Sequence, residues 1–447
     1  MRAPVRRAGA ALTGILVFGA ACTYYNALYN AEHLFEDAER HRRAGRDSLA
    51  APLYRDVVRK AANGFRGDPT GGWAYDAAFL LGRAHLRSGD YGAARAAFRH
   101  SSRLAETADE RLAAMVYTGI LEAASGDRAT AISLFNEALA GTTVPSVRGE
   151  GHMHRGMLLL AAGNPDAGWW DLDRAASQHP PLRVEATLAR LRWAVELDDR
   201  RRTDESVQRL LSYPEAALRA DAFLGAVHAA EVRWGPASAA ELLAAADEAA
   251  WERDVRDHLA LEHARLLRRA GRTAEAERRA LEVADGRGRT AAEARLTLAE
   301  WSLAQADDVG DAYALRGLLL PSLDDTGVAG LLDAIDDFET LAFAGVDTPL
   351  AWFLAGEVAR DRLGAPRVAR ELFLAYANAA PEEPWAPKAL LAALQLSEHE
   401  PARERLRARL ERHPRSPYVL AARGRPAVGF EALEEELLAR LTEIRPR

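Results

Sequence analysis

The sequence predicts an all-α fold made of consecutive helix hairpins. Apolar residues recur at i, i+3, i+4 and i+7 along most of the chain, which is the spacing of one helix face, and no sustained alternation of β-branched residues predicts a strand. A small residue followed seven positions later by a glycine also returns every 37 residues. These positions are Gly82 and Gly89, Gly119 and Gly126, and Gly156 and Gly163. Such a period predicts stacked helix pairs whose first helix ends at a glycine.

The composition fits a folded protein and excludes several functions. Hydrophobic residues make up 49% of the 447 residues and charged residues 28%, which excludes a disordered or collagen-like chain. The 58 basic and 65 acidic residues give a net charge of −7, so we expect no nucleic-acid partner, which would require a surplus of positive charge. Cys22 is the only cysteine, and this excludes intramolecular disulfides and a cysteine zinc cluster.

The first 21 residues have the pattern of an export signal. Arg2, Arg6 and Arg7 precede an apolar run from Ala8 to Ala21, and these 14 residues are too few for a membrane-spanning helix, which needs about 20. We therefore expect residues 1–21 to be a signal peptide that is removed after export.

The residues that end this run resemble the lipobox of bacterial lipoproteins. They are Gly19-Ala20-Ala21-Cys22, with Gly19 where leucine is commonest. The resemblance implies cleavage before Cys22 and lipidation of its thiol, which would hold the protein on a membrane. The alternative is an ordinary signal peptide cleaved after Ala20 or Ala21. Thr23 stands where aspartate would signal retention, which resembles lipoproteins sent to the outer membrane. The implied location is the cell envelope, lipid-anchored and facing the periplasm, with the outer membrane favoured over the inner.

The repeat resembles the tetratricopeptide repeat between about residues 75 and 180. Each copy adds a small residue on the second helix and a large apolar residue four positions later: Ala94 and Phe98, Ala131 and Phe135, Gly168 and Leu172. Weaker copies follow the same order at Ala38, Gly45, Ala50 and Tyr54; at Ala194, Ser206 and Leu210; at Ala239 and Leu243; at Ala264, Gly271 and Ala276; and at Gly356, Ala369 and Phe373. The resemblance implies a right-handed superhelix of tetratricopeptide-like hairpins.

The pattern predicts an N-terminal array over residues 22–306 and further repeats over 331–447. Between them, residues 307–330 break the periodicity with Asp-Asp and Pro-Ser turns, so we expect an irregular insertion that could be a hinge or a binding loop. It would separate a helix over 290–306 from one over 331–343. The last predicted helix, over 431–444, carries an apolar stripe and should cap the final repeat. That stripe consists of Phe430, Leu433, Leu437, Leu441 and Ile444.

No motif predicts an enzyme, a cofactor or a metal site. The sequence lacks a P-loop, a dinucleotide-binding glycine pattern, a Gly-x-Ser-x-Gly elbow and His-Glu-x-x-His. His152 and His154 are spaced to point to opposite sides of a helix, so we expect solvated surface histidines and not a metal site. The acidic cluster of Asp333, Asp336, Asp337 and Glu339 lacks the spacing of a calcium loop and is expected to be one charged helix face.

The tetratricopeptide resemblance also implies a concave groove lined by the first helix of each hairpin. Its matching positions here are Asp76, Phe79, Arg83 and Leu86; Ala113, Val116, Ile120 and Ala123; and Glu150, Met153, Met157 and Leu160. We take Phe79, Arg83, Val116, Ile120, Met153 and Met157 as the candidate protein-binding residues. The alternative is that they pack against neighbouring repeats. Of the adjacent Trp169 and Trp170, one should enter the core and the other should point outward.

The segment after Cys22 has a closer resemblance. Tyr24-Tyr25-Asn26-Ala27-Leu28-Tyr29-Asn30-Ala31 is similar to the opening of tetratricopeptide lipoproteins of bacterial outer membranes, which are related in plan to the lipoprotein subunit of the β-barrel assembly machine. The first hypothesis is a non-enzymatic, membrane-anchored scaffold that binds other envelope proteins or peptides in its groove, with outer-membrane assembly as one setting. The second is a substrate-capturing lipoprotein of a nutrient-uptake system. A third, an envelope enzyme such as a lytic transglycosylase, would need an added catalytic domain.

Overall fold

The computed structural model describes residues 27–249 and 251–445, and over these ranges it contains helices and turns but no strand. The predicted all-α class is therefore confirmed. The chain divides into two compact units, Met1–Val255 and Arg256–Arg447. Cys22 and the predicted signal segment over residues 1–21 lie outside the described residues.

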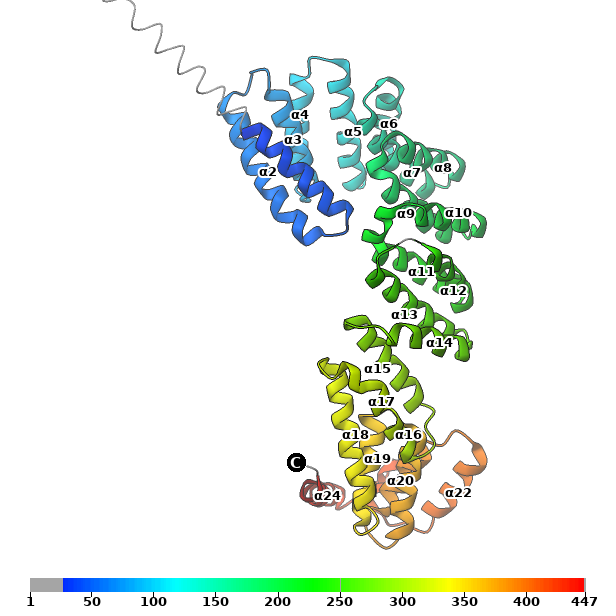
Figure 1. The fold of residues 1–447 in the computed structure, drawn as a ribbon. Coiled ribbons are helices and arrows are strands. Elements are labelled where there is room, and N and C mark those ends of the chain that lie inside the picture. The colour runs from blue at the N-terminus through cyan, green and yellow to red at the C-terminus, as the bar shows by residue number, and fades with distance from the viewer. Residues whose placement is uncertain (1–26, 250, 446–447) are drawn as a thin grey trace, which may run out of the picture. The chain divides into compact units, whose positions relative to one another are not determined.

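The N-terminal unit consists of helix pairs joined by short turns (Figure 1). A helix over residues 27–43 comes first. It is followed by α2 (Asp47–Gly67), α3 (Ala74–Arg87), α4 (Tyr91–Leu104), α5 (Ala108–Ala124), α6 (Arg128–Gly141), α7 (Pro145–Ala161), α8 (Pro165–Gln178), η1 (Pro180–Leu182), α9 (Arg183–Glu196), α10 (Arg200–Leu211), η2 (Pro214–Arg219), α11 (Ala220–Trp234), α12 (Pro236–Ala244) and η3 (Ala245–Glu248).

The two helices of a hairpin approach most closely at the predicted small residues. A Cβ added at Gly82 would lie 2.5 Å from Cε1 of Phe98, and one added at Gly119 would lie 2.8 Å from Cε1 of Phe135. Both phenylalanines are buried. The glycine on the first helix therefore makes room for the ring on the second, which confirms the predicted repeat.

The turns between paired helices depend on a positive φ. Gly89 and Gly126 have φ values of 76° and 95°, a conformation that costs glycine little. Asp127 then caps α6, because its side chain accepts a hydrogen bond from the backbone N–H of Thr130. Between α9 and α10 the same turn is made by Asp198 at a φ of 60°, although the sequence offers no glycine there.

The C-terminal unit continues the helical array. Its helices are α13 (Arg253–Arg269, which begins at the boundary), α14 (Thr273–Ala284), α15 (Arg289–Leu303), α16 (Val309–Ala314), α17 (Arg316–Leu319), η4 (Leu320–Ser322), α18 (Thr326–Ala344), α19 (Pro349–Asp361), α20 (Pro366–Ala379), α21 (Ala386–Gln395), α22 (Glu400–Leu410), α23 (Pro417–Ala422) and α24 (Phe430–Ile444).

The predicted irregular insertion over residues 307–330 is mostly helical. It contains α16, α17 and η4, and α18 begins inside it at Thr326. Ala312, Leu315 and Leu319 are buried in the same core as Phe338 of α18. The expectation of an irregular segment was therefore wrong, because its apolar residues are enough to pack short helices. A hinge role for this segment stays a prediction.

The terminal helix α24 packs as expected from its apolar stripe. Leu437 and Leu441 are buried, and the remaining stripe residues pack against the same core. The indole N–H of Trp385 donates a hydrogen bond of 3.1 Å to the backbone carbonyl of Leu433, which ties α24 to the start of α21.

Among the described helices, none combines the length and the apolar composition that crossing a membrane requires.

Candidate functional site

The predicted groove residues are largely inside the protein. Val116, Ile120 and Met153 have exposed fractions of 0%, 4% and 3%, so the expected exposure of these three side chains is wrong. They fill the space between neighbouring helices, which is the packing alternative considered above. Phe79 and Met157 are half-buried, and a binding role for them stays a prediction.

A buried network of charges joins the first hairpins of the array to α7. Its centre is Glu39, on the helix over 27–43, which is 3% exposed. Arg87 of α3 donates from Nε to Glu39 Oε1 at 2.9 Å, and Tyr54 donates its hydroxyl proton to the same oxygen at 2.6 Å. Arg87 also reaches Glu150 of α7 at 3.3 Å, so one guanidinium joins two buried carboxylates from different helices.

Contacts between residues far apart in the sequence join the first hairpin to α9 and to the end of η2. Arg42 donates to Glu39 and also, from Nη1, to Glu185 Oε1 of α9 at 2.9 Å. Arg219, at the end of η2, donates to the backbone carbonyl of Arg43 at 3.2 Å. The first hairpin therefore contacts residues more than 140 positions later, and Glu150, one of the expected groove positions, belongs to the same set of buried ion pairs.

The charges in this network stabilise one another. Burial raises the pKa of Glu39, but the guanidinium groups of Arg87 and Arg42 outweigh burial and lower it to about 2. Burial likewise opposes ionisation of Glu150, and Arg87 and His154 nevertheless hold its pKa well below the usual range. Both carboxylates are therefore ionised at neutral pH, and each depends on its arginine partners.

Arg83, another predicted groove residue, is also held by its neighbours. Its guanidinium carbon lies 4.2 Å from the ring centre of Phe35 and 5.0 Å from that of Tyr117. These contacts join the helix over 27–43 to α3 and α5 through cation–π interactions. The side chain is therefore largely engaged within the unit.

The two histidines of α7 are not solvated as expected. His152 is 3% exposed, and its Nδ1 lies 2.7 Å from Oδ1 of the buried Asp171. Arg155 donates two further hydrogen bonds to the Asp171 carboxylate, both of 2.7 Å. Burial raises the pKa of Asp171, but the hydrogen bonds from Arg155 and His152 lower it more, so the carboxylate stays charged. The surface expectation failed because Asp171 lies on the next helix, where it can pair with both His152 and Arg155.

Within the described ranges, no group of three or more His, Cys, Asp or Glu side chains is arranged to hold a metal ion. The acidic residues of α18 pair with arginines. Arg316 contacts Asp336 and Glu339, and Arg362 contacts Asp337. This arrangement fits the expected charged helix face.

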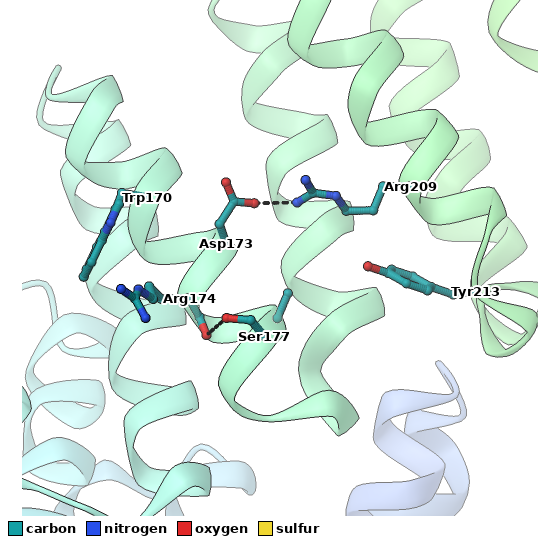
Figure 2. Close-up of a pocket in the computed structure, with 7 residues that line it drawn as sticks. Trp170, Asp173, Arg174, Ser177, Arg209 and Tyr213 are labelled. Carbon is teal, nitrogen blue, oxygen red and sulfur yellow. Dashed lines mark hydrogen bonds and ion pairs between the residues drawn. The ribbon is translucent and has the colours of Figure 1, made fainter.

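An exposed cavity lies between α8 and α10, the second helices of two successive hairpins (Figure 2). It has a volume of about 430 Å³ and is lined by Trp170, Asp173, Arg174, Ala176, Ser177, Arg209 and Tyr213. Trp169 is 4% exposed and Trp170 is 51% exposed, which confirms that one tryptophan of the pair enters the core and the other faces outward. Sequence reasoning predicted one outward tryptophan without assigning which of the two, and it did not predict the residues of α10 beside it.

The walls of this cavity are held in place by ring and ion contacts. The Arg174 guanidinium carbon lies 4.9 Å from the Trp170 ring centre. His152 meets the same indole edge-on, at 5.5 Å between ring centres. Figure 2 shows Tyr213 at the opposite end, with its hydroxyl directed toward Asp173 and Arg209, which are paired with each other. A rigid aromatic and cationic surface of this kind can bind a flat or anionic group of another molecule.

No protein-family model matches the chain. A search of curated proteins also gives no match. Among solved structures, the chain is similar to a tetratricopeptide repeat protein from Parabacteroides merdae, with 14% identity, a TM-score of 0.33, and coverage of 60% of this chain and 97% of that one. It is also similar to a human IFIT1 dimer with m7Gppp-AAAA, with 13% identity, a TM-score of 0.34, and coverage of 63% and 66%. At these values the similarity extends to no ligand or activity.

Proposed function

We propose that the protein is a non-enzymatic scaffold of the cell envelope that binds other proteins on the α8–α10 surface. The observation that carries the proposal is the cavity lined by Trp170, Arg174, Arg209 and Tyr213. Exposed tryptophan, tyrosine and arginine are the residue types that contribute most to protein interfaces. Trp170 is fixed from below by His152 and from the side by Arg174, so little side-chain freedom is lost when a partner binds.

The same proposal places the partner site outside the expected concave groove. Among the expected groove positions, Val116, Ile120, Met153 and Glu150 are buried, so these side chains are not available to a peptide. The second helices of the hairpins present the exposed aromatic residue instead.

The proposal includes a lipid anchor at Cys22 and attachment to a membrane, with the outer membrane favoured. It rests on the signal-like residues 1–21 and the lipobox resemblance, and outer-membrane assembly is one setting that fits. Cys22→Ala should release the protein into the soluble periplasmic fraction or leave an uncleaved precursor. A variant that matures normally and still partitions into detergent would contradict the anchor.

Site-specific photo-crosslinking in intact cells tests the binding surface. A photo-reactive phenylalanine analogue in place of Tyr213 should give discrete crosslinked bands, and Trp170→Ala in the same chain should remove them. The matched control places the analogue at Tyr91 of α4, an exposed tyrosine on the second helix of another hairpin. Crosslinks that are equal at both positions, or that survive the loss of Trp170, would refute the proposed surface. Capture of a nutrient transporter would support the uptake alternative in place of assembly factors.

A further inference from the structure

The cavity between α8 and α10 has more positive charge than its own carboxylate neutralises. Arg174 and Arg209 both line it, and Asp173 is the carboxylate among its lining residues. Asp173 is shared, because the largely buried Arg190 lies 2.6 Å from the same oxygen that contacts Arg209. Arg190 also lies 3.9 Å from Glu205, so the positive charge that is left without a carboxylate partner among the described residues is that of the exposed Arg174.

The Arg174 guanidinium is the group best placed to use this charge. It stacks on Trp170, and within the described part of the chain no carboxylate lies within ion-pair distance of it. A guanidinium stacked on an indole keeps its N–H groups in one plane, where they can bind both oxygens of a carboxylate. Arg209, by contrast, is directed at Asp173 and paired with it (Figure 2).

The aromatic walls add a second requirement for a ligand. Trp170 is 51% exposed, and Tyr213 is held at the far end by Arg183, whose guanidinium carbon lies 4.7 Å from its ring centre. Arg183 is itself fixed by Glu215. Inorganic phosphate would use the cations but leave both rings uncovered, whereas a side chain with a flat apolar surface would cover them.

Resting on the proposed function, we infer that this cavity binds an acidic peptide segment of the partner protein. A carboxylate of the segment lies against Arg174, and a neighbouring aromatic side chain covers Trp170. The segment binds as an extended chain or a helix end, because the cavity is lined by only two helices and the residues that follow α10.

Titration of synthetic peptides into the purified full chain tests this inference. The probes are a peptide of alternating glutamate and phenylalanine, its amide twin with glutamine in place of each glutamate, and a lysine version. The acidic peptide should bind about tenfold more tightly than the amide twin, which is the size expected for one charge-assisted hydrogen-bonded contact. The difference should shrink as salt is added, because the contact is exposed.

Variants of the chain distinguish the contribution of the arginine charge to peptide affinity from that of the aromatic rings. Arg174→Gln should weaken the acidic peptide about tenfold and leave the amide twin unchanged, so that the preference disappears. Trp170→Leu should weaken both peptides. The matched control is Arg99→Gln, which removes an exposed arginine from the second helix α4 and should change neither affinity.

Three results would overturn the inference: equal affinity for the acidic peptide and its twin, tighter binding of the lysine peptide, or an acid preference that survives Arg174→Gln. Displacement of the peptide by millimolar phosphate with no effect of Trp170→Leu would also overturn it, in favour of a simple anion site. If crosslinking at Tyr213 succeeds and the peptides show no acid preference, only the partner chemistry fails. If crosslinking fails, the proposed binding function fails.

Discussion

Replacing Glu39 by glutamine tests whether the buried ion pairs hold the first hairpin in place. Glutamine has the shape of the protonated acid, so Glu39→Gln removes the charge and little else. Arg42 and Arg87 would keep Glu185 and Glu150 as partners, but the bonds that both donate to Glu39 would lose their ionic character.

The magnitude follows from the pKa of Glu39. Folding lowers this pKa from 4.5 to about 2. Because each tenfold change in proton affinity corresponds to roughly 1.4 kcal/mol, folding stabilises the ionised form of Glu39 relative to the protonated form by about 3 kcal/mol. Loss of one partner from a buried ion pair typically costs about 3 to 5 kcal/mol, which agrees. We therefore expect Glu39→Gln to lower the free energy of unfolding of the N-terminal unit by about 3 kcal/mol at pH 7.

Urea unfolding followed by circular dichroism measures this difference. Asp37→Asn is the matched control, because Asp37 lies on the same helix and its 3.0 Å pair with Arg40 is exposed. A surface pair of this kind contributes at most about 1 kcal/mol. The reasoning would be refuted if the glutamine variant lost no more stability than the control.

The lowered pKa of Glu39 also predicts that its contribution to the free energy of unfolding depends on pH. Because the folded-state pKa of Glu39 is lowered, its stabilisation is complete above about pH 4.5 and is lost as the pH falls toward about 2. The stability difference between the native chain and Glu39→Gln should therefore shrink below about pH 4.5. A difference that stayed constant down to pH 3 would show that Glu39 acts through its shape and not through its charge.

Two further substitutions test the packing. Gly119→Leu should destabilise the chain by about 1 to 3 kcal/mol or more, because even a Cβ at this position would press on Phe135. Gly225→Ala is the control, because a Cβ there would meet open space, and it should be neutral or stabilising. Thermal unfolding measures both. Leu437→Ala should cost about 2 to 5 kcal/mol because Leu437 is on the buried face of α24. Its 65% exposed neighbour Leu438 should tolerate alanine within about 0.5 kcal/mol, and equal losses would contradict the capping role of that helix.

The sequence was sufficient for features that depend on near neighbours. The contact of Gly119 with Phe135 joins positions 16 apart, and the period of the repeat predicts it directly. That only one of Trp169 and Trp170 faces outward follows from the roughly 100° turn between adjacent helix residues. The positive φ of Asp198 could not be predicted, because a single aspartate in this conformation leaves no signal in composition.

Features that depend on distant residues could not be predicted. Glu39 and Glu150 resemble ordinary surface acids in the sequence, and their burial results from the way in which separate hairpins meet. The burial of Val116, Ile120 and Met153 could not be predicted for the same reason, since family positions specify which helix face a residue occupies but not what covers that face. Arg209 and Tyr213 joined the candidate site only because α10 packs beside α8.

The ion pairs between the first hairpin and α9 change how the array should respond to evolution and to engineering. In an open repeat array each unit contacts only its neighbours, so copies can be added or removed and folding can begin anywhere. Here Arg42 must meet Glu185, and Arg219 must reach the backbone of Arg43, so the number of repeats between them is fixed. An inserted copy would separate Arg42 from Glu185 and Arg219 from the backbone carbonyl of Arg43. The N-terminal unit should therefore fold as one cooperative block, and more slowly than its helical content alone would suggest.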